Sequence, residues 1–218
     1  MKQKIISSII IVFSIICGVV TKDYFLGSLV LMCGLLNSYL ASEKKIINYV
    51  FGAVYCLLSG YVCFKNGLYG TAALSFAVYF PFQILGFYNW LKHINTEEEV
   101  ETRGFTLKNS IVIVSLCIIG SLTIGFLLSK IPTQQLAFLD STSVILNLCG
   151  IVLMNLRFKE CWSIWLVTNT VDLIIWIINF INKTENSTTM LLVSIGYGII
   201  NIFGLIKWNK EKIEIDEH

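Results

Sequence analysis

Eight apolar segments follow one another along the chain, separated by short polar stretches. Each has about 17 to 24 residues, enough for a helix to cross a hydrocarbon core of about 30 Å. Only 14% of the 218 residues are charged, against roughly 25% in soluble domains. We therefore expect an all-α integral membrane protein with about eight transmembrane helices. The segments span 5–21, 24–41, 46–64, 68–91, 109–129, 136–157, 161–182 and 189–208.

The basic residues divide unevenly between the two sides that these segments define. With eight crossings, twelve of the 16 Lys and Arg residues fall on the side of the N-terminus. The other four are Lys22, Lys65, Lys130 and Lys183. Because loops rich in Lys and Arg stay in the cytoplasm, we expect a multi-pass protein of the plasma (cytoplasmic) membrane with both termini in the cytoplasm.

The first segment and the longest polar stretch each allow two interpretations. Lys2 and Lys4 precede the first segment as in a signal peptide, but no small-residue cleavage site follows, so we expect a retained helix. The stretch KHINTEEEVETRG, residues 92–104, is expected to be a solvated loop. The seven cysteines lie in or beside apolar segments without C-x-x-C spacing, which indicates packing rather than a metal site or disulfides.

Two of the apolar segments resemble each other. YFPFQILGFYNWLK, residues 79–92, and YGIINIFGLIKWNK, residues 197–210, share five identities in fourteen at an offset of 118. Such self-similarity predicts two copies of a three-helix unit. A fifth segment between the copies adds one crossing and makes them parallel, a 3+1+3 plan known from transporters with a midplane substrate site. A duplicated bundle with a structural role is the alternative.

This plan divides the chain into five parts. They are an N-terminal transmembrane helix (1–23), a first three-helix repeat (24–92), a cytoplasmic loop with a linker helix (93–135), a second three-helix repeat (136–210) and a cytoplasmic tail (211–218).

A polar stripe runs along the segment 161–182. Trp165, Asn169, Asp172 and Trp176 recur at helical spacing and share one face, whereas the residues between them are apolar. A charged side chain at the bilayer centre costs roughly 2.5 to 3.5 kcal/mol on insertion scales, and such residues usually face a cavity. The tryptophans and the carboxylate together suit a flat, positively charged ring. Alternatively, Asp172 is a structural residue that hydrogen-bonds a neighbouring helix.

The first repeat contributes a second polar face. Gln83 shares it with Tyr79 and Trp90, and Asn201 takes the position of Gln83 in the second repeat. These amides are expected either to bind a carboxamide or ribose hydroxyls, or to hold helices together. Trp90 has a second interpretation as an interfacial anchor. We expect no second carboxylate in the core to pair with Asp172.

The stretch WSIWLVTNTVD, residues 162–172, resembles the W-x-x-W-x-x-x-N-x-x-D signature of the PnuC family of bacterial vitamin transporters. FQILGFYNW, residues 82–90, is similar to the glutamine-containing motif of that family's first repeat. The resemblance implies facilitated diffusion of a non-phosphorylated vitamin, chiefly nicotinamide riboside, with trapping by phosphorylation in the cytoplasm. It implies ligand contacts at Trp165, Asn169, Asp172, Trp176, Gln83, Tyr88 and Trp90, to which the repeat adds Asn201.

Several alternatives stay open at this point. Relatives in the family are thought to carry thiamine, riboflavin or deoxynucleosides, and sugar carriers of the SWEET type share the 3+1+3 plan. An intramembrane enzyme is not expected, because the core lacks a nucleophile beside a histidine. We expect no cofactor, no metal and no nucleic-acid partner. The expected partners are the small-molecule substrate and the lipid bilayer, and a homo-oligomer is possible.

Overall fold

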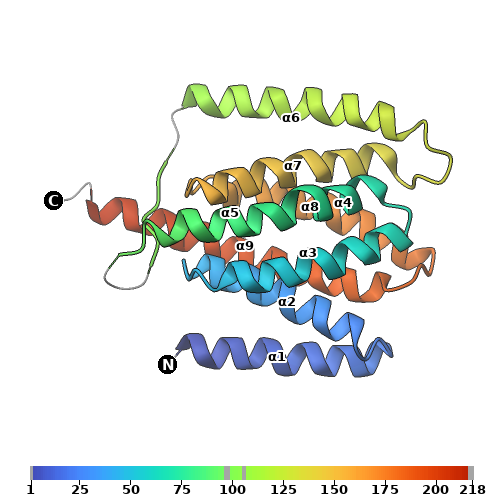
Figure 1. The fold of residues 1–218 in the computed structure, drawn as a ribbon, viewed down its shortest axis with the longest axis horizontal. Coiled ribbons are helices and arrows are strands. Elements are labelled where there is room, and N and C mark those ends of the chain that lie inside the picture. Colours follow the sequence, from blue (N-terminus) through green and yellow to red (C-terminus); the bar gives the residue numbers. More distant parts are fainter. Residues whose placement is uncertain (1, 96–98, 105–106, 216–218) are drawn as a thin grey trace.

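The computed structural model describes residues 2–95, 99–104 and 107–215, which are mainly helical. Because α4, the π-helical stretch η1 and α5 follow one another without a break, the described residues form eight helical rods (Figure 1). The elements are α1 (Lys2–Thr21), α2 (Leu26–Ser42), α3 (Asn48–Lys65), α4 (Tyr69–Leu74), η1 (Ser75–Tyr79), α5 (Phe80–Leu91), α6 (Leu107–Leu128), α7 (Ala137–Asn155), α8 (Cys161–Ile181) and α9 (Ser187–Ile215).

The eight rods coincide with the eight expected segments, but not every rod is long and apolar enough to cross a membrane by itself. Six spans of the described chain are long and apolar enough to cross a membrane. α2 is apolar but has 17 residues, and α3 contains three tyrosines and begins at a buried asparagine, Asn48. Most residues of α2 are buried by neighbouring helices, so it needs little lipid-facing surface of its own. The chain is thus an all-helical membrane protein in which two central helices depend on their neighbours.

Basic residues in the left-handed conformation end several of these helices. Lys44 (φ 57°), Arg157 (φ 68°) and Lys183 (φ 55°) follow α2, α7 and α8. The N–H of the next residue then donates to the carbonyl five residues earlier in the chain, which is the pattern of a Schellman motif. The N–H of Lys45, for example, donates to the Leu40 carbonyl at 2.9 Å. A positive charge beside the free carbonyls also stabilises the negative end of the helix dipole.

The six helices of the two expected repeats form a closed ring. α3 contacts α2 and the α4–α5 rod, and α8 contacts α7 and α9. The ring closes because α2 packs on α9 and the α4–α5 rod packs on α7. α1 lies outside the ring against α2, and α6 lies outside it against α7 (Figure 1). The first helix of each unit therefore contacts the third helix of the other.

The two ends of the bundle are distinguished below as the N-side, where α1 begins, and the far side, where α1 ends. α9 ends at the N-side, as an even number of rods requires (Figure 1). The loops that join α1 to α2, α3 to α4, α6 to α7 and α8 to α9 lie at the far side.

Three tryptophans form a buried cluster at the N-side. Trp90 and Trp162 are 0% exposed and Trp208 is 1% exposed. The ring centroid of Trp208 lies 6.2 Å from that of Trp90 and 5.8 Å from that of Trp162. The expectation of a solvated loop at 92–104 is wrong for Val100, which packs into this cluster and is 1% exposed. Val100 is buried because its side chain packs on the apolar surface of the tryptophan cluster.

Backbone and ionic contacts hold the same loop against both units. The N–H of Arg103 donates to the Arg157 carbonyl at 2.8 Å, beside the start of α8. Glu99 lies 3.8 Å from the ammonium of Lys45 and 3.9 Å from that of Lys207. The described part of this loop is therefore a packed element of the N-side.

We predict that Val100→Thr destabilises the protein by about 1 to 3 kcal/mol, because it places a hydroxyl without a partner among buried rings. The measurement is thermal unfolding of the purified protein in detergent. Ile131→Thr is a matched control, since Ile131 lies in the α6–α7 loop and is 39% exposed. Equal destabilisation by the two changes would show that Val100 contributes no packing energy.

Candidate ligand cavity

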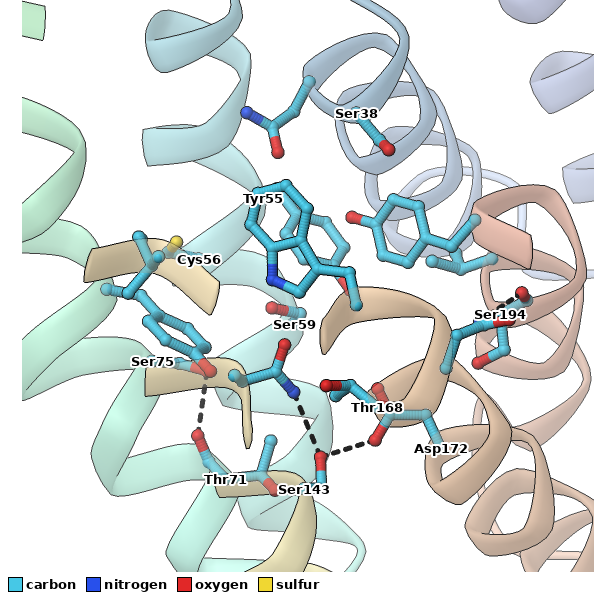
Figure 2. A pocket seen from close by; sticks show the side chains of 18 of the residues that line it. Ser38, Tyr55, Cys56, Ser59, Thr71, Ser75, Ser143, Thr168, Asp172 and Ser194 are labelled. Atoms are coloured by element: carbon cyan, nitrogen blue, oxygen red, sulfur yellow. Dashed lines mark hydrogen bonds between the residues drawn. The ribbon is translucent and has the colours of Figure 1, made fainter. Parts of the chain in front are cut away.

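A buried cavity lies inside the ring of six helices. Its wall includes residues of α2, α3, the α4–α5 rod, α7, α8 and α9, so both units contribute (Figure 2). The described lining residues carry one carboxylate, Asp172, and no Lys, Arg or His. Most of the other lining side chains carry an aromatic ring, an amide or a hydroxyl. The cavity therefore suits an uncharged or cationic ligand with ring and hydrogen-bonding groups.

Six of the eight predicted ligand residues lie in the wall of this cavity. Because α8 carries the spacing noted in the sequence, it presents four of them on its inner face, and α5 and α9 contribute one each. They are Trp165, Asn169, Asp172, Trp176, Gln83 and Asn201. The structure brings these residues together from three helices and both units.

The structure does not bring Tyr88 and Trp90 to the cavity. Tyr88 is 60% exposed on the outside of α5, because five residues beyond Gln83 correspond to about 140° of rotation around a helix. Trp90 lies on the same face as Gln83 but about 10 Å farther along the axis. Its Nε1 donates to the Met154 carbonyl at 3.1 Å within the N-side cluster. Trp90 is accordingly a packing residue of the N-side in this structure.

Asp172 is held by a hydrogen-bonded pair on the neighbouring helix. The Ser143 hydroxyl donates to Oδ1 of Asp172 at 2.5 Å, and Nδ2 of Asn147 donates to the Ser143 hydroxyl at 3.1 Å (Figure 2). The interhelical bond considered as the structural alternative is thus present. Asp172 also borders the cavity, so the bond to α7 fixes the carboxylate at the wall.

Two polar atoms in the wall have no hydrogen-bond partner among the described residues. They are the amide oxygen of Gln83 and the hydroxyl of Tyr79, and both atoms are buried. Leaving such a group unpaired costs roughly 1 to 3 kcal/mol. In contrast, the Nδ2 groups of Asn169 and Asn201 donate to the carbonyls of Ser194 at 2.7 Å and Trp165 at 3.2 Å. Gln83 and Tyr79 therefore bring unsatisfied polar groups to the wall of the cavity.

A π-helical turn places these two residues in the wall. η1 ends at Tyr79, two residues before Pro81 in the first turn of α5. Proline has no N–H to donate to the Ala77 carbonyl, and its ring crowds that carbonyl, so the turn widens. π-turns inside helices are frequent at functional sites. The corresponding helix of the second unit, α9, continues without such a break.

Several wall residues did not stand out in the sequence. Tyr55 and Tyr197 meet edge to face with ring centroids 5.9 Å apart, on opposite units. Ser143 and Asn147 are four residues apart in the segment 136–157, a spacing that would have indicated a polar face on α7.

The core holds a second carboxylate, Asp140, whose hydrogen-bond partners do not include Asp172. Asp140 is 0% exposed although it lies in the first turn of α7. The start of α4 covers it and supplies two backbone N–H donors, from Gly70 at 3.0 Å and Thr71 at 3.1 Å. Asp140 does not border the cavity, so its burial is a property of the interface between the units.

A comparison with protein families matches residues 24–210 to the family described as nicotinamide mononucleotide transporter. The chain belongs to this family. It is therefore a membrane transporter and not an enzyme, and the matched range coincides with the span from the first expected repeat to the second.

PnuC proteins are among the relatives of this chain. It is 30% identical over 201 residues to the nicotinamide riboside transporter PnuC of Neisseria mucosa, covering 88% of this chain and 74% of that one. The Haemophilus influenzae protein of the same name is 25% identical over 206 residues, covering 93% and 87%. A crystal structure of the vitamin B3 transporter PnuC superposes with a TM-score of 0.85 and 28% identity, covering 96% of this chain and 91% of that one. The fold is that of PnuC.

We predict that Gln83→Met weakens binding of nicotinamide riboside about tenfold, because it removes the free amide from the wall while keeping a side chain of similar length. Tyr88→Phe is the control and should change the dissociation constant less than about twofold, since its hydroxyl lies outside the cavity. Quenching of tryptophan fluorescence by the added ligand measures the dissociation constant of each variant. A large loss with Tyr88→Phe alone would contradict this assignment of the two faces of α5.

Proposed function

We propose that this chain takes up nicotinamide riboside by facilitated diffusion, and that phosphorylation in the cytoplasm traps the imported riboside. The observation that carries the proposal is a cavity whose wall combines tryptophans, unpaired hydrogen-bonding groups and a single carboxylate. The names of the relatives from Neisseria mucosa and Haemophilus influenzae support it independently.

The pyridinium ring of nicotinamide riboside is flat, aromatic and positively charged. Trp165 and Trp176 border the cavity on the same helix as Asp172. A cation over a tryptophan face gains about 0.5 to 2 kcal/mol, and more where water is excluded. The carboxylate adds an attraction that a neutral ring would not receive.

The carboxamide and ribose of the same ligand need hydrogen-bond partners. Gln83 offers a free amide oxygen and Tyr79 a free hydroxyl, both buried in the first unit. An amide oxygen accepts from a carboxamide N–H or a ribose hydroxyl, and a tyrosine hydroxyl both donates and accepts. The second unit would thus hold the charged ring and the first unit the polar groups.

The charge of the wall also favours the riboside over the mononucleotide, although the family description names the latter. A phosphate group is usually bound by Arg, Lys or a helix N-terminus. The described lining residues include no basic side chain, and Asp172 would repel the phosphate.

The arrangement of helices supports alternating access by two parallel three-helix units, α2 to α5 and α7 to α9, around this cavity. Each unit contacts the other along two seams, α2 with α9 and the α4–α5 rod with α7. Rocking of the units would open the seams at one end at a time. In the plasma membrane, the basic N-side faces the cytoplasm together with both termini.

Thiamine is the second candidate substrate within the family, because it is also a cationic aromatic molecule. Riboflavin, deoxynucleosides and the sugars of SWEET-type carriers are neutral, and the carboxylate in the wall gives them no advantage.

We predict that nicotinamide riboside raises the unfolding temperature of the purified protein and that nicotinamide mononucleotide does not. A ligand at 100 times its dissociation constant stabilises by about 2.7 kcal/mol. The panel includes thiamine, riboflavin and a deoxynucleoside. A larger shift with the mononucleotide would refute the charge argument, and no shift with any of these compounds would refute the proposed substrate.

We predict that Asp172→Asn weakens binding of nicotinamide riboside by at least about tenfold and leaves binding of its uncharged reduced form nearly unchanged. Ser143→Ala is the matched control, because it removes the donor at 2.5 Å and keeps the carboxylate, so the preference for the cation should persist. Equal losses for the charged and reduced ligands with Asp172→Asn would identify Asp172 as a structural residue.

A further inference from the structure

Asp140 joins the two units at the far side through the start of α4. Its carboxylate accepts the backbone N–H groups of Gly70 and Thr71, at 3.0 and 3.1 Å, and the hydroxyl of Thr71. Nε2 of Gln134 donates to the same carboxylate at 2.8 Å. A carboxylate at the start of a helix meets unpaired N–H groups and the positive end of the dipole. One side chain of the second unit thus caps the third helix of the first unit.

Asp23 makes an equivalent connection across the other seam. It lies just before α2, and its Oδ1 accepts the Gly27 N–H at 2.8 Å. Its Oδ2 accepts from Nδ2 of Asn186 at 2.5 Å and from the hydroxyl of Thr189 at 3.1 Å, at the start of α9. One side chain before the first helix of the first unit thus binds the third helix of the second unit.

The residues of the two connections occupy nearly corresponding positions in the two copies of the internal repeat. Asp23 and Asp140 are 117 residues apart, and Thr71 and Thr189 are 118 apart, the offset that aligns the two copies. Each carboxylate lies against a glycine, Gly70 of the opposite unit for Asp140 and Gly27 of the adjoining helix α2 for Asp23, where an added Cβ would lie 2.8 and 2.4 Å from the respective Oδ2. The pair is therefore one device present once per seam.

We propose that Asp23 and Asp140 are paired latches that hold the far side of the transporter closed and separate when the cavity opens to that side. Both seams between the units must widen at the far side for a ligand to enter, and each is bridged there by one of these carboxylates. This inference uses the alternating access proposed above and does not depend on which substrate is carried.

The position of the latches suits reversible opening. Both lie at helix starts at the far side of the bundle, and water replaces each protein hydrogen bond at a small net cost once the seam opens. Charge-assisted bonds are stronger than neutral ones, so the closed form is favoured while they persist. At the N-side, the Trp90 indole bonded to the Met154 carbonyl bridges the same pair of rods, so the two ends are held by different chemistry.

The test uses a cysteine that already borders the cavity. Cys56 is 3% exposed and lies in the wall on α3, so it reports access when the other six cysteines are replaced by alanine. The full-length protein is reconstituted in vesicles without substrate, and a membrane-impermeant methanethiosulfonate is applied on the side of the α8–α9 loop. Asp140→Asn and Asp23→Asn should each accelerate modification of Cys56 by roughly tenfold, and the double variant by more.

Glu185→Gln is the matched control, since Glu185 is an exposed carboxylate in the α8–α9 loop at the same end and should leave the rate unchanged. Thr71→Val and Thr189→Val keep both carboxylates, remove one donor each and should accelerate modification by a smaller factor. They also test the proposal where an Asp variant does not fold. Rates equal to those of the unaltered protein in the folded variants would assign the carboxylates a static role and overturn the proposal. Binding of nicotinamide riboside is measured separately, so failure of the proposed substrate would remain distinct.

Discussion

Hydrogen bonding without water is the constraint on which the rest of this structure depends. Inside a bilayer, each polar group must find a partner within the protein or border an aqueous space. Asp172, Asn169 and Asn201 meet this requirement through Ser143 and the carbonyls of Ser194 and Trp165. Among the groups that do not meet it, those of Gln83 and Tyr79 border the cavity, whereas the indole N–H groups of Trp162 and Trp208 lie in the N-side cluster. The same rule therefore explains the rigid wall, and two of its exceptions lie at the proposed ligand cavity.

The two units share a framework and differ in chemistry. The seams, the far-side carboxylates and the N-side tryptophans Trp90 and Trp208 occur in both copies. The carboxylate of the cavity wall belongs to the second unit, and the π-helical turn with its free groups belongs to the first. A framework built from two similar units can thus enclose a site that would bind a ligand in one orientation.

Much of the fold could be predicted because each helix that crosses a membrane appears in the sequence as a long apolar segment. The polar face of α8 was predictable for the same reason, since residues three or four apart share a face. Tyr88 and Trp90 entered the predicted set through the family motif, although a step of five residues from Gln83 turns Tyr88 to another face of the helix and a step of seven places Trp90 about 10 Å farther along the axis. Asp140 and Val100 could not be recognised, since their burial depends on segments about 70 and 62 residues away, α4 and Trp162.

The positions of α1 and α6 change how the internal repeat is defined. Each packs outside the ring against the first helix of the unit that follows it. α6 is therefore placed relative to the second unit as α1 is placed relative to the first. A unit of four crossings returns the chain to its starting side, so a tandem duplication of such a unit gives two parallel copies in a single step. No separate insertion of a linking helix is then needed in the origin of the gene.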